Sequence, residues 1–125
     1  MVMIRWLEKR WQISWTMVVV IAVLIFYFSS LTGGQIGGPS SLKPIVYHIT
    51  IFFIFSFFLF IAVIAGKNRK FIPFVISLAA LYGILDELHQ YFVPGRSAAV
   101  SDFLLDGMGI VFAFLLYGII LEYRK

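Results

Sequence analysis

The chain has no cysteine and few charged residues, and each absence excludes a class of protein or site. Without cysteine there is no disulfide framework, no thiol nucleophile and no thiolate metal ligand. Only 13% of the residues are charged and 62% are hydrophobic, whereas about a quarter charged is typical of soluble domains. The sequence also lacks an H-E-x-x-H zinc motif and internal repeats. An ordinary water-soluble domain is therefore excluded.

Long apolar runs take the place of the amphipathic patterns of water-facing elements. A helix needs about 20 residues to cross the hydrocarbon core of a bilayer. The sequence predicts four such spans, at residues 13–31, 44–65, 71–92 and 101–123. Because they use most of the chain, we expect an all-α integral membrane protein, a four-transmembrane-helix bundle in a single domain at residues 1–125.

The segments between the apolar runs contain residues that end helices. Glycine and proline interrupt residues 33–39, and a short polar turn covers residues 66–70. Pro94 and Gly95 favour a tight turn, so the third helix is expected to stop near Phe92. Ser101 or Asp102 is the expected N-cap of the fourth helix.

Lysine and arginine are distributed unevenly over the connections. Eight lie in the two terminal segments and the 67–70 turn, whereas only Lys43 and Arg96 lie on the other side. The positive-inside rule then predicts a cell-membrane protein with both termini in the cytoplasm. The first span is expected to be retained, since no small-residue cleavage site follows it. The net charge of +4 reflects topology and affinity for anionic lipid, so no nucleic acid partner is expected.

Polar residues gather where the predicted helices reach the non-cytoplasmic side. Four of the six acidic residues and both histidines lie there. Tyr82, Asp86, His89 and Gln90 have the three- or four-residue spacing of one helix side, and Glu87 lies further round. The spacing also places Asp102, Asp106, Gly109 and Ala113 on one side of the fourth helix. Its small residues are expected to pack against the third helix.

Charged groups in a bilayer are costly, which favours a function for this group of residues. An ionisable side chain at mid-bilayer costs about 2.5–3.5 kcal/mol on insertion scales, and less near the interface. Any one of these residues has a structural alternative, because Asp86, His89, Arg96 and Asp102 would also serve as a clamp between helix ends. A clamp rarely needs so many charged groups, so we favour a functional site.

The segment from Asp86 to Ser97, together with Asp102, Asp106 and Gly109, resembles the signature of the VanZ-like membrane protein family. That signature is an acidic pair, His-Gln, an aromatic residue and Pro-Gly-Arg, followed by an aspartate and a glycine in the last helix. Phe26 to Ser30 resembles the Phe-x-x-Ser-Ser end of the family's first helix. Two positions depart from the pattern. The family has a lysine three residues before a histidine near the start of the second helix, whereas here Lys43 precedes His48 by five residues. Asp106 stands where asparagine is common in the family.

The resemblance implies a role in the cell envelope, and the family's namesake is a teicoplanin-resistance protein. We expect a site that binds membrane lipid, either a lipid headgroup or a lipid-linked envelope precursor, at the outer leaflet. The predicted ligand-binding residues are His48, Asp86, Glu87, His89, Gln90, Arg96, Asp102 and Asp106. The same acids and histidines suit acid–base chemistry or a divalent metal. No metal set or cofactor is predicted.

The main alternative is a membrane-embedded hydrolase or transferase that acts on a lipid-linked phosphate. A transporter is least favoured, because the cytoplasmic halves of the spans lack charged residues. A homo-oligomer stays open, since four helices of this length bury little surface and their glycine-rich sides suit helix contacts.

Overall fold

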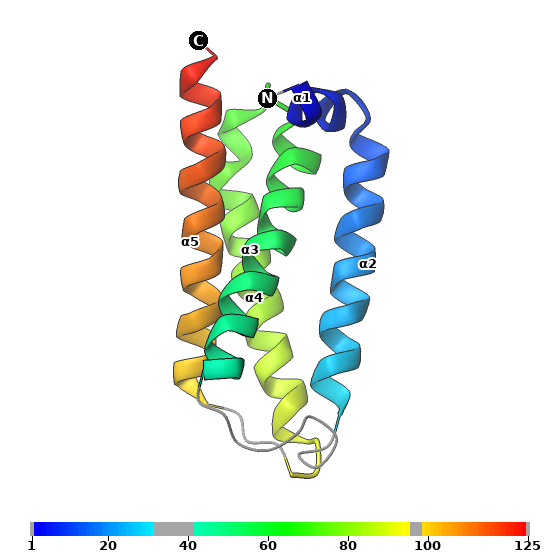
Figure 1. Cartoon of the computed structure of the whole chain (residues 1–125), viewed down its shortest axis with the longest axis vertical. Coiled ribbons are helices and arrows are strands. Elements are labelled where there is room, and N and C mark those ends of the chain that lie inside the picture. Colours follow the sequence, from blue (N-terminus) through cyan, green and yellow to red (C-terminus); the bar gives the residue numbers. More distant parts are fainter. Residues whose placement is uncertain (1, 32–41, 96–98, 125) are drawn as a thin grey trace.

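A computed structural model describes residues 2–31, 42–95 and 99–124. Four long helices run side by side in alternating directions (Figure 1): α2 (Trp11–Ser30), α3 (Leu42–Ile64), α4 (Ile72–Tyr91) and α5 (Val100–Tyr123). Each is long and apolar enough to cross a membrane. No strand occurs in the described part of the chain. The predicted all-α bundle of four spans is confirmed, with every helix end within two residues of its expected place.

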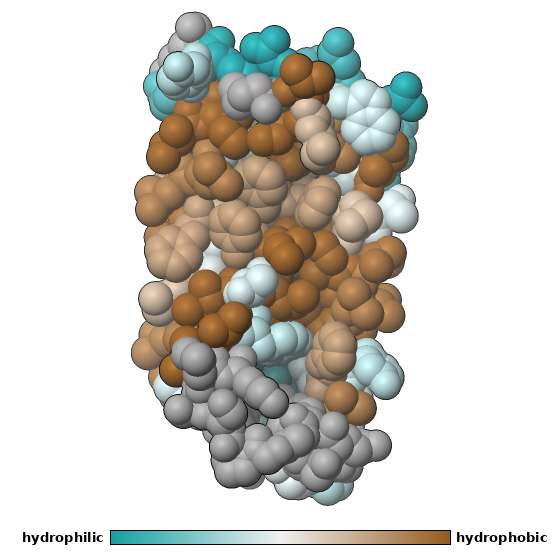
Figure 2. All heavy atoms as spheres, in the orientation of Figure 1, coloured by the Kyte–Doolittle hydropathy of each residue, from teal (hydrophilic) through white to brown (hydrophobic). Residues whose placement is uncertain are grey.

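Both termini lie at the same end of the bundle, which we call the terminal end, and the opposite end is the site end (Figure 1). A broad band of hydrophobic residues covers the middle of the bundle on the face shown in Figure 2, and hydrophilic residues gather at the terminal end. Which end faces the cytoplasm stays a prediction from the distribution of lysine and arginine.

A short helix that the apolar pattern did not predict, α1 (Val2–Lys9), lies across the terminal end (Figure 1). Glu8 anchors it, because this carboxylate accepts hydrogen bonds from the guanidinium of Arg124 and the hydroxyl of Tyr117. These three residues form the terminal clamp. After α3, Ala65 and Gly66 adopt positive φ angles of 51° and 73°, and the 3-10 helix η1 (Arg69–Phe71) leads into α4.

Both α3 and α4 contact the three other long helices, and the most extensive packing is that of α3. By contrast, α2 and α5 lie on opposite sides of it and make no contact in the described residues. Between lipid-immersed helices, packing stabilises association more than burial from water does. Large side chains of α3 fill this interior, among them Phe52, Phe55, Leu59, Phe60, Ile61 and Ile64, all at most 4% exposed.

The packing partner expected for the small residues of α5 is wrong. A Cβ on Gly109 would lie 2.4 Å from the carbonyl oxygen of Ile49 and 2.8 Å from the nitrogen of Phe53, so Gly109 packs against α3. The prediction placed this side of α5 against α4, because a short turn joins those two helices. In the structure α3 makes the close backbone approach to Gly109, and such an approach requires a residue without a side chain.

The expected start of the last helix is also wrong in detail. Its N-cap is Ala99, and no side-chain cap from Ser101 or Asp102 is made. Helix α4 ends at Tyr91, as the following proline predicted, and Gly95 has a positive φ of 75° in the turn. The backbone N–H of Ala99 instead donates to Glu87 Oε2 at 3.2 Å, which ties the start of α5 to α4.

Candidate functional site

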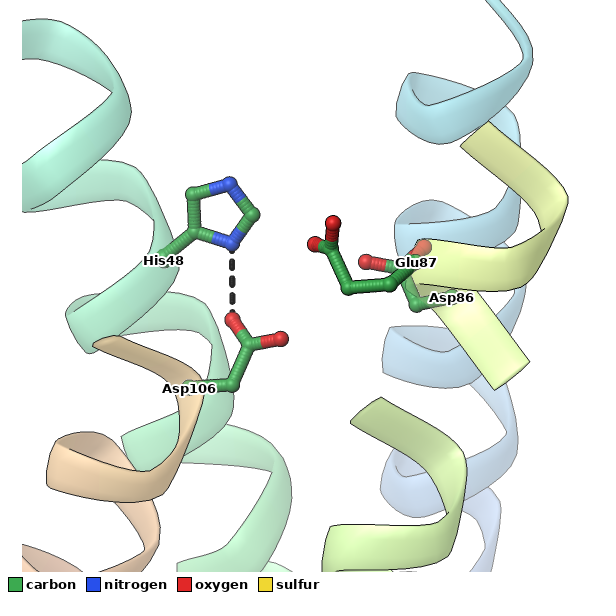
Figure 3. A group of neighbouring side chains, drawn as sticks. All are labelled: His48, Asp86, Glu87 and Asp106. Carbon is green, nitrogen blue, oxygen red and sulfur yellow. Dashed lines mark hydrogen bonds and ion pairs between the residues drawn. The ribbon is translucent and has the colours of Figure 1, made fainter. Parts of the chain in front are cut away.

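Four acidic and histidine side chains from three helices meet inside the site end (Figure 3). His48 comes from α3, Asp86 and Glu87 come from α4, and Asp106 comes from α5. All four are buried, with Asp106 fully so and Glu87 9% exposed. One ligand atom from each lies within 4.8 Å of the others. We call these four residues the acid–histidine cluster.

His48 and Asp106 form a close pair across the α3–α5 interface. His48 Nδ1 and Asp106 Oδ1 are 2.7 Å apart. The other ring nitrogen, Nε2, lies 4.0 Å from Asp102 Oδ1, whose side chain is 24% exposed at the rim of the cluster. The close approach at Gly109, one turn along α5, sets this geometry because it brings the α5 backbone against α3. The imidazole is therefore fixed in place by a buried carboxylate.

Asp86 is fixed from the side of α2. Ser29 Oγ donates to Asp86 Oδ1, and Gln90 Nε2 donates to Asp86 Oδ2 at 3.1 Å and to Ser29 Oγ at 3.3 Å. Gln90 is one helical turn beyond Asp86 and only 2% exposed. Hydrogen bonds of this kind hold a carboxylate in one orientation, as around metal and catalytic sites.

Two oxygens of the cluster lack hydrogen bonds. Glu87 Oε1 and Asp106 Oδ2 are buried and have no partner among the described residues. Figure 3 shows the Glu87 carboxylate pointing toward the His48–Asp106 pair. A buried polar group without a partner costs about 1–3 kcal/mol, and more if it is charged. These oxygens are available to a ligand, and one that bonded to them would recover that cost.

A shallow groove lies on the outer surface of the bundle between α4 and α5. Its volume is about 370 Å³, and its walls are almost entirely apolar. The lining residues are Ile84, Glu87, Leu88, Tyr91, Ala99, Val100 and Phe103. Glu87 is the one acid among them, and it is also a member of the cluster. The groove and the acid–histidine cluster therefore share Glu87.

His89 lies apart from the cluster, although its spacing grouped it with Asp86. Its ring stacks on Phe26 at 4.5 Å, and its Nε2 is 2.9 Å from Ser30 Oγ. Tyr82 likewise donates to the carbonyl oxygen of Ala22. The polar side of α4 predicted from spacing does exist, but it contacts α2. Glu87, expected further round, is the α4 residue that points toward His48 and Asp106.

The structure does not describe the side chains of two residues named from the sequence. Arg96 lies outside the described residues, as does the side chain of Lys43. Ser29 was not predicted as a site residue, although it belongs to the Phe26–Ser30 segment of the family resemblance. That segment was the available signal, because a serine pair at the end of an apolar helix has few other partners in a bilayer. The ligand-binding role of all these residues stays a prediction.

The sequence profile of the VanZ/LLP1 family matches residues 11–121. The chain belongs to the VanZ/LLP1 family. The match covers α2, α3 and α4, all of α5 but its last two residues, and every member of the acid–histidine cluster, which confirms the predicted family. No curated protein and no solved structure matched the sequence significantly.

The chemistry available to this VanZ-family site follows from its charges. Carboxylates accept hydrogen bonds from hydroxyl and ammonium groups and ligate cations. The imidazole held by Asp106 can move a proton. A free phosphate would meet the acids of the cluster as like charges, so an anionic group needs a compensating cation there.

Proposed function

We propose that this VanZ-family protein binds a cell-envelope lipid or lipid-linked precursor at the outer leaflet. One observation carries the proposal: Glu87 lines the apolar α4–α5 groove and also belongs to the buried acid–histidine cluster. A lipid that approached along the bilayer would place an acyl or isoprenoid chain against Leu88 and Phe103. Its headgroup would then reach the cluster without leaving the membrane.

The polar end of the ligand should carry hydrogen-bond donors. Asp86 already accepts from Ser29 and Gln90, while Glu87 and Asp106 each keep one unpartnered oxygen. Sugar hydroxyls or an amine would supply donors to those oxygens. Arg96 is proposed to bind a phosphate or carboxylate at the entrance, since its planar guanidinium makes bidentate contacts with such groups.

In the cell, binding of an envelope precursor would contribute to glycopeptide resistance. A protein that holds an envelope precursor at the outer leaflet would shield it from a drug such as teicoplanin. The family name suggests this role, and the lipid-facing groove supports it. Deleting the gene should raise glycopeptide sensitivity only where such precursors exist.

Lipid capture by the purified protein tests the proposal. The wild type would be placed in nanodiscs with polar lipids and polyprenyl-linked sugars, repurified and analysed by mass spectrometry. We expect one unmodified species to be enriched. Leu88→Trp should abolish the enrichment by filling the groove, and Glu87→Gln should weaken it by changing the carboxylate that joins groove and cluster.

Leu81→Trp is the matched control, because Leu81 lies two turns earlier on α4, is similarly exposed and does not line the groove. It should retain the lipid. Equal lipid content in wild type, Leu88→Trp and Leu81→Trp would contradict groove binding. Arg96→Ala would show separately whether the headgroup phosphate is recognised.

The alternative function is a hydrolase or transferase on a lipid-linked phosphate, and the 2.7 Å His48–Asp106 pair favours it. A histidine oriented by a buried carboxylate is a common arrangement for a general base. In the same experiment, a new product mass formed by the wild type and lost in Asp106→Asn would establish catalysis. It would also demote the binding proposal.

A further inference from the structure

We propose that the acid–histidine cluster binds one divalent transition-metal cation of the Zn²⁺ or Mn²⁺ kind. The ligands would be a ring nitrogen of His48 and one carboxylate oxygen each from Asp86, Glu87 and Asp106. The sequence predicted no metal set, because its spacing shows no metal-binding motif. The four donors come from three helices and meet only in the folded bundle.

The distances suit a metal ion. The four donor atoms lie within 4.8 Å of one another. Two ligands of one ion are at most two metal–ligand distances apart, about 4.2 Å on Zn²⁺ and about 5 Å on Ca²⁺. The cluster therefore needs only small side-chain rotations to close around an ion.

The unpartnered oxygens point to a ligand that the protein itself does not supply. Asp106 is fully buried, and its Oδ2 has no hydrogen-bond partner in the described residues. Glu87 Oε1 is in the same state, while its Oε2 is held by the N–H of Ala99. Glu87 and Asp106 thus each have one oxygen held by the protein and one directed into the cluster (Figure 3).

The surrounding hydrogen bonds resemble the outer shell of a metal site. Ser29 and Gln90 hold Asp86, as neighbouring residues orient metal-ligating carboxylates elsewhere. Gly83 lets α4 approach the cluster closely, since a Cβ there would be in van der Waals contact with Asp106 Oδ2 at 3.4 Å. The carboxylates of the cluster are therefore oriented by their surroundings.

Charge also favours a cation. Three carboxylates and one histidine share the cluster, and Asp102 lies at its rim. Within the described part of the chain, no lysine or arginine bonds to Glu87 or Asp106. Burying uncompensated charge is costly, and a divalent ion would neutralise most of it. The mixture of imidazole and carboxylate suits Zn²⁺ or Mn²⁺ better than Ca²⁺ or Mg²⁺, which prefer oxygen alone.

One consequence rests on the proposed lipid-binding function. A bound cation would turn an acidic site into an acceptor for phosphate oxygens, so that a lipid phosphate would bind through the ion. Cation binding itself needs no such lipid, and the two ideas fail separately in the experiment that follows.

The test is cation titration of the metal-stripped protein in phosphatidylcholine nanodiscs that lack any envelope precursor. We expect calorimetry to show one Zn²⁺ bound per chain. For Mn²⁺, we expect the electron paramagnetic resonance signal of the free ion to fall by an amount that corresponds to one ion per chain. Glu87→Gln and Asp106→Asn should each weaken affinity at least about tenfold. Both keep the size of the side chain, so circular dichroism should show an unchanged helical bundle.

Glu122→Gln is the matched control, because it removes an acid from the exposed terminal end, where Glu122 pairs with Arg69. It should bind the cation like the wild type. Absence of stoichiometric binding, or equal affinity in wild type and Glu87→Gln, would overturn the proposal. Cation binding without lipid capture would leave this inference standing and reject only the proposed function.

Discussion

The two ends of the bundle bury charged groups in opposite ways. At the terminal clamp, Glu8 accepts bonds from Arg124 Nη1 at 2.8 Å, Arg124 Nη2 at 2.7 Å and Tyr117 at 2.7 Å. Burial tends to raise the pKa of Glu8, but the bonds from Arg124 and Tyr117 outweigh it and the pKa falls below its ordinary value. At the acid–histidine cluster, acids face one histidine and two buried oxygens are unpartnered.

This difference separates a structural contact from a binding site. A matched ion pair with every oxygen satisfied holds two helices together and needs nothing more. A cluster with excess charge of one sign and unpartnered oxygens is destabilising until a ligand arrives, and proteins tolerate such sites where function requires them. Removing a charged group from the terminal clamp should therefore lower stability, whereas removing a carboxylate charge from the cluster should raise it.

The largest expected effect comes from Gly109→Ala. The added Cβ would meet the α3 backbone at 2.4 Å and force α5 away from α3. We expect a loss of about 2–3 kcal/mol in the free energy of unfolding, measured by SDS titration in mixed micelles, together with loss of cation binding. Gly107→Ala, with nothing within 4 Å of its Cβ, should be near neutral. Because alanine favours a helix more than glycine does, helix propensity alone cannot lower stability in either variant. Similar losses in both variants would therefore mean that the close approach of α5 to α3 is not the cause.

Arg124→Met should give the next largest effect. It leaves Glu8 without its cation, in a position where the two side chains are only 8% and 13% exposed. A loss of about 2 kcal/mol is expected in the same titration, because a partly buried carboxylate would lose its charged partner. Lys67→Met, at an exposed position of the same end, is the control. An unchanged wild-type midpoint in Arg124→Met would show that the clamp adds no stability.

Glu87→Gln should shift stability the other way. The change removes one of the facing charges while the amide oxygen can still accept from Ala99. We expect a gain of about 1 kcal/mol in metal-free, precursor-free micelles, and a loss relative to wild type once Zn²⁺ is added. Destabilisation in the metal-free state would make Glu87 a structural bridge like Glu8, and the contrast between the two ends would disappear.

The contribution of the terminal clamp to stability should depend on pH only in the acid range. This effect should be smaller than the effects of the three substitutions above. Because the pKa of Glu8 is lowered on folding from 4.5, its contribution is present above about pH 4.5 and is lost as pH falls through the folded-state value. The stability difference between wild type and Glu8→Gln should therefore shrink below pH 4.5. A difference that stays constant from pH 7 to pH 3 would argue that the carboxylate charge is not involved.

The smallest effect is expected for His89→Gln. His89 contacts Phe26 and Ser30 and lies apart from the cluster. Its replacement should change cation affinity by less than about twofold, as for substitutions remote from a site, whereas His48→Gln should weaken it strongly. Calorimetry of His89→Gln and His48→Gln compares the contributions of the two histidines to cation affinity. Equal losses would extend the site to the α2 side of α4.

The sequence predicted the four spans and the meeting of acids and histidines at one end, because apolar length and glycine–proline breaks are local signals. It did not predict α1, since eight residues of mixed polarity resemble an ordinary basic terminus. Helical spacing also groups residues by side without naming the neighbouring helix. For that reason Gly109 was assigned to the wrong partner, and His89 was grouped with Asp86 although only Asp86 belongs to the cluster.

The apolar middle of the bundle determines which solution can exchange ions with the acid–histidine cluster. Between its two polar ends, residues 11–30, 49–64, 72–85 and 107–121 contain no aspartate, glutamate, histidine, lysine or arginine. Ions and protons are therefore not expected to cross this stretch, because it offers no charged or titratable side chains along the way. Occupancy of the proposed cation site is then expected to depend on the solution at its own end and on the surrounding lipid, and not on the solution at the terminal end.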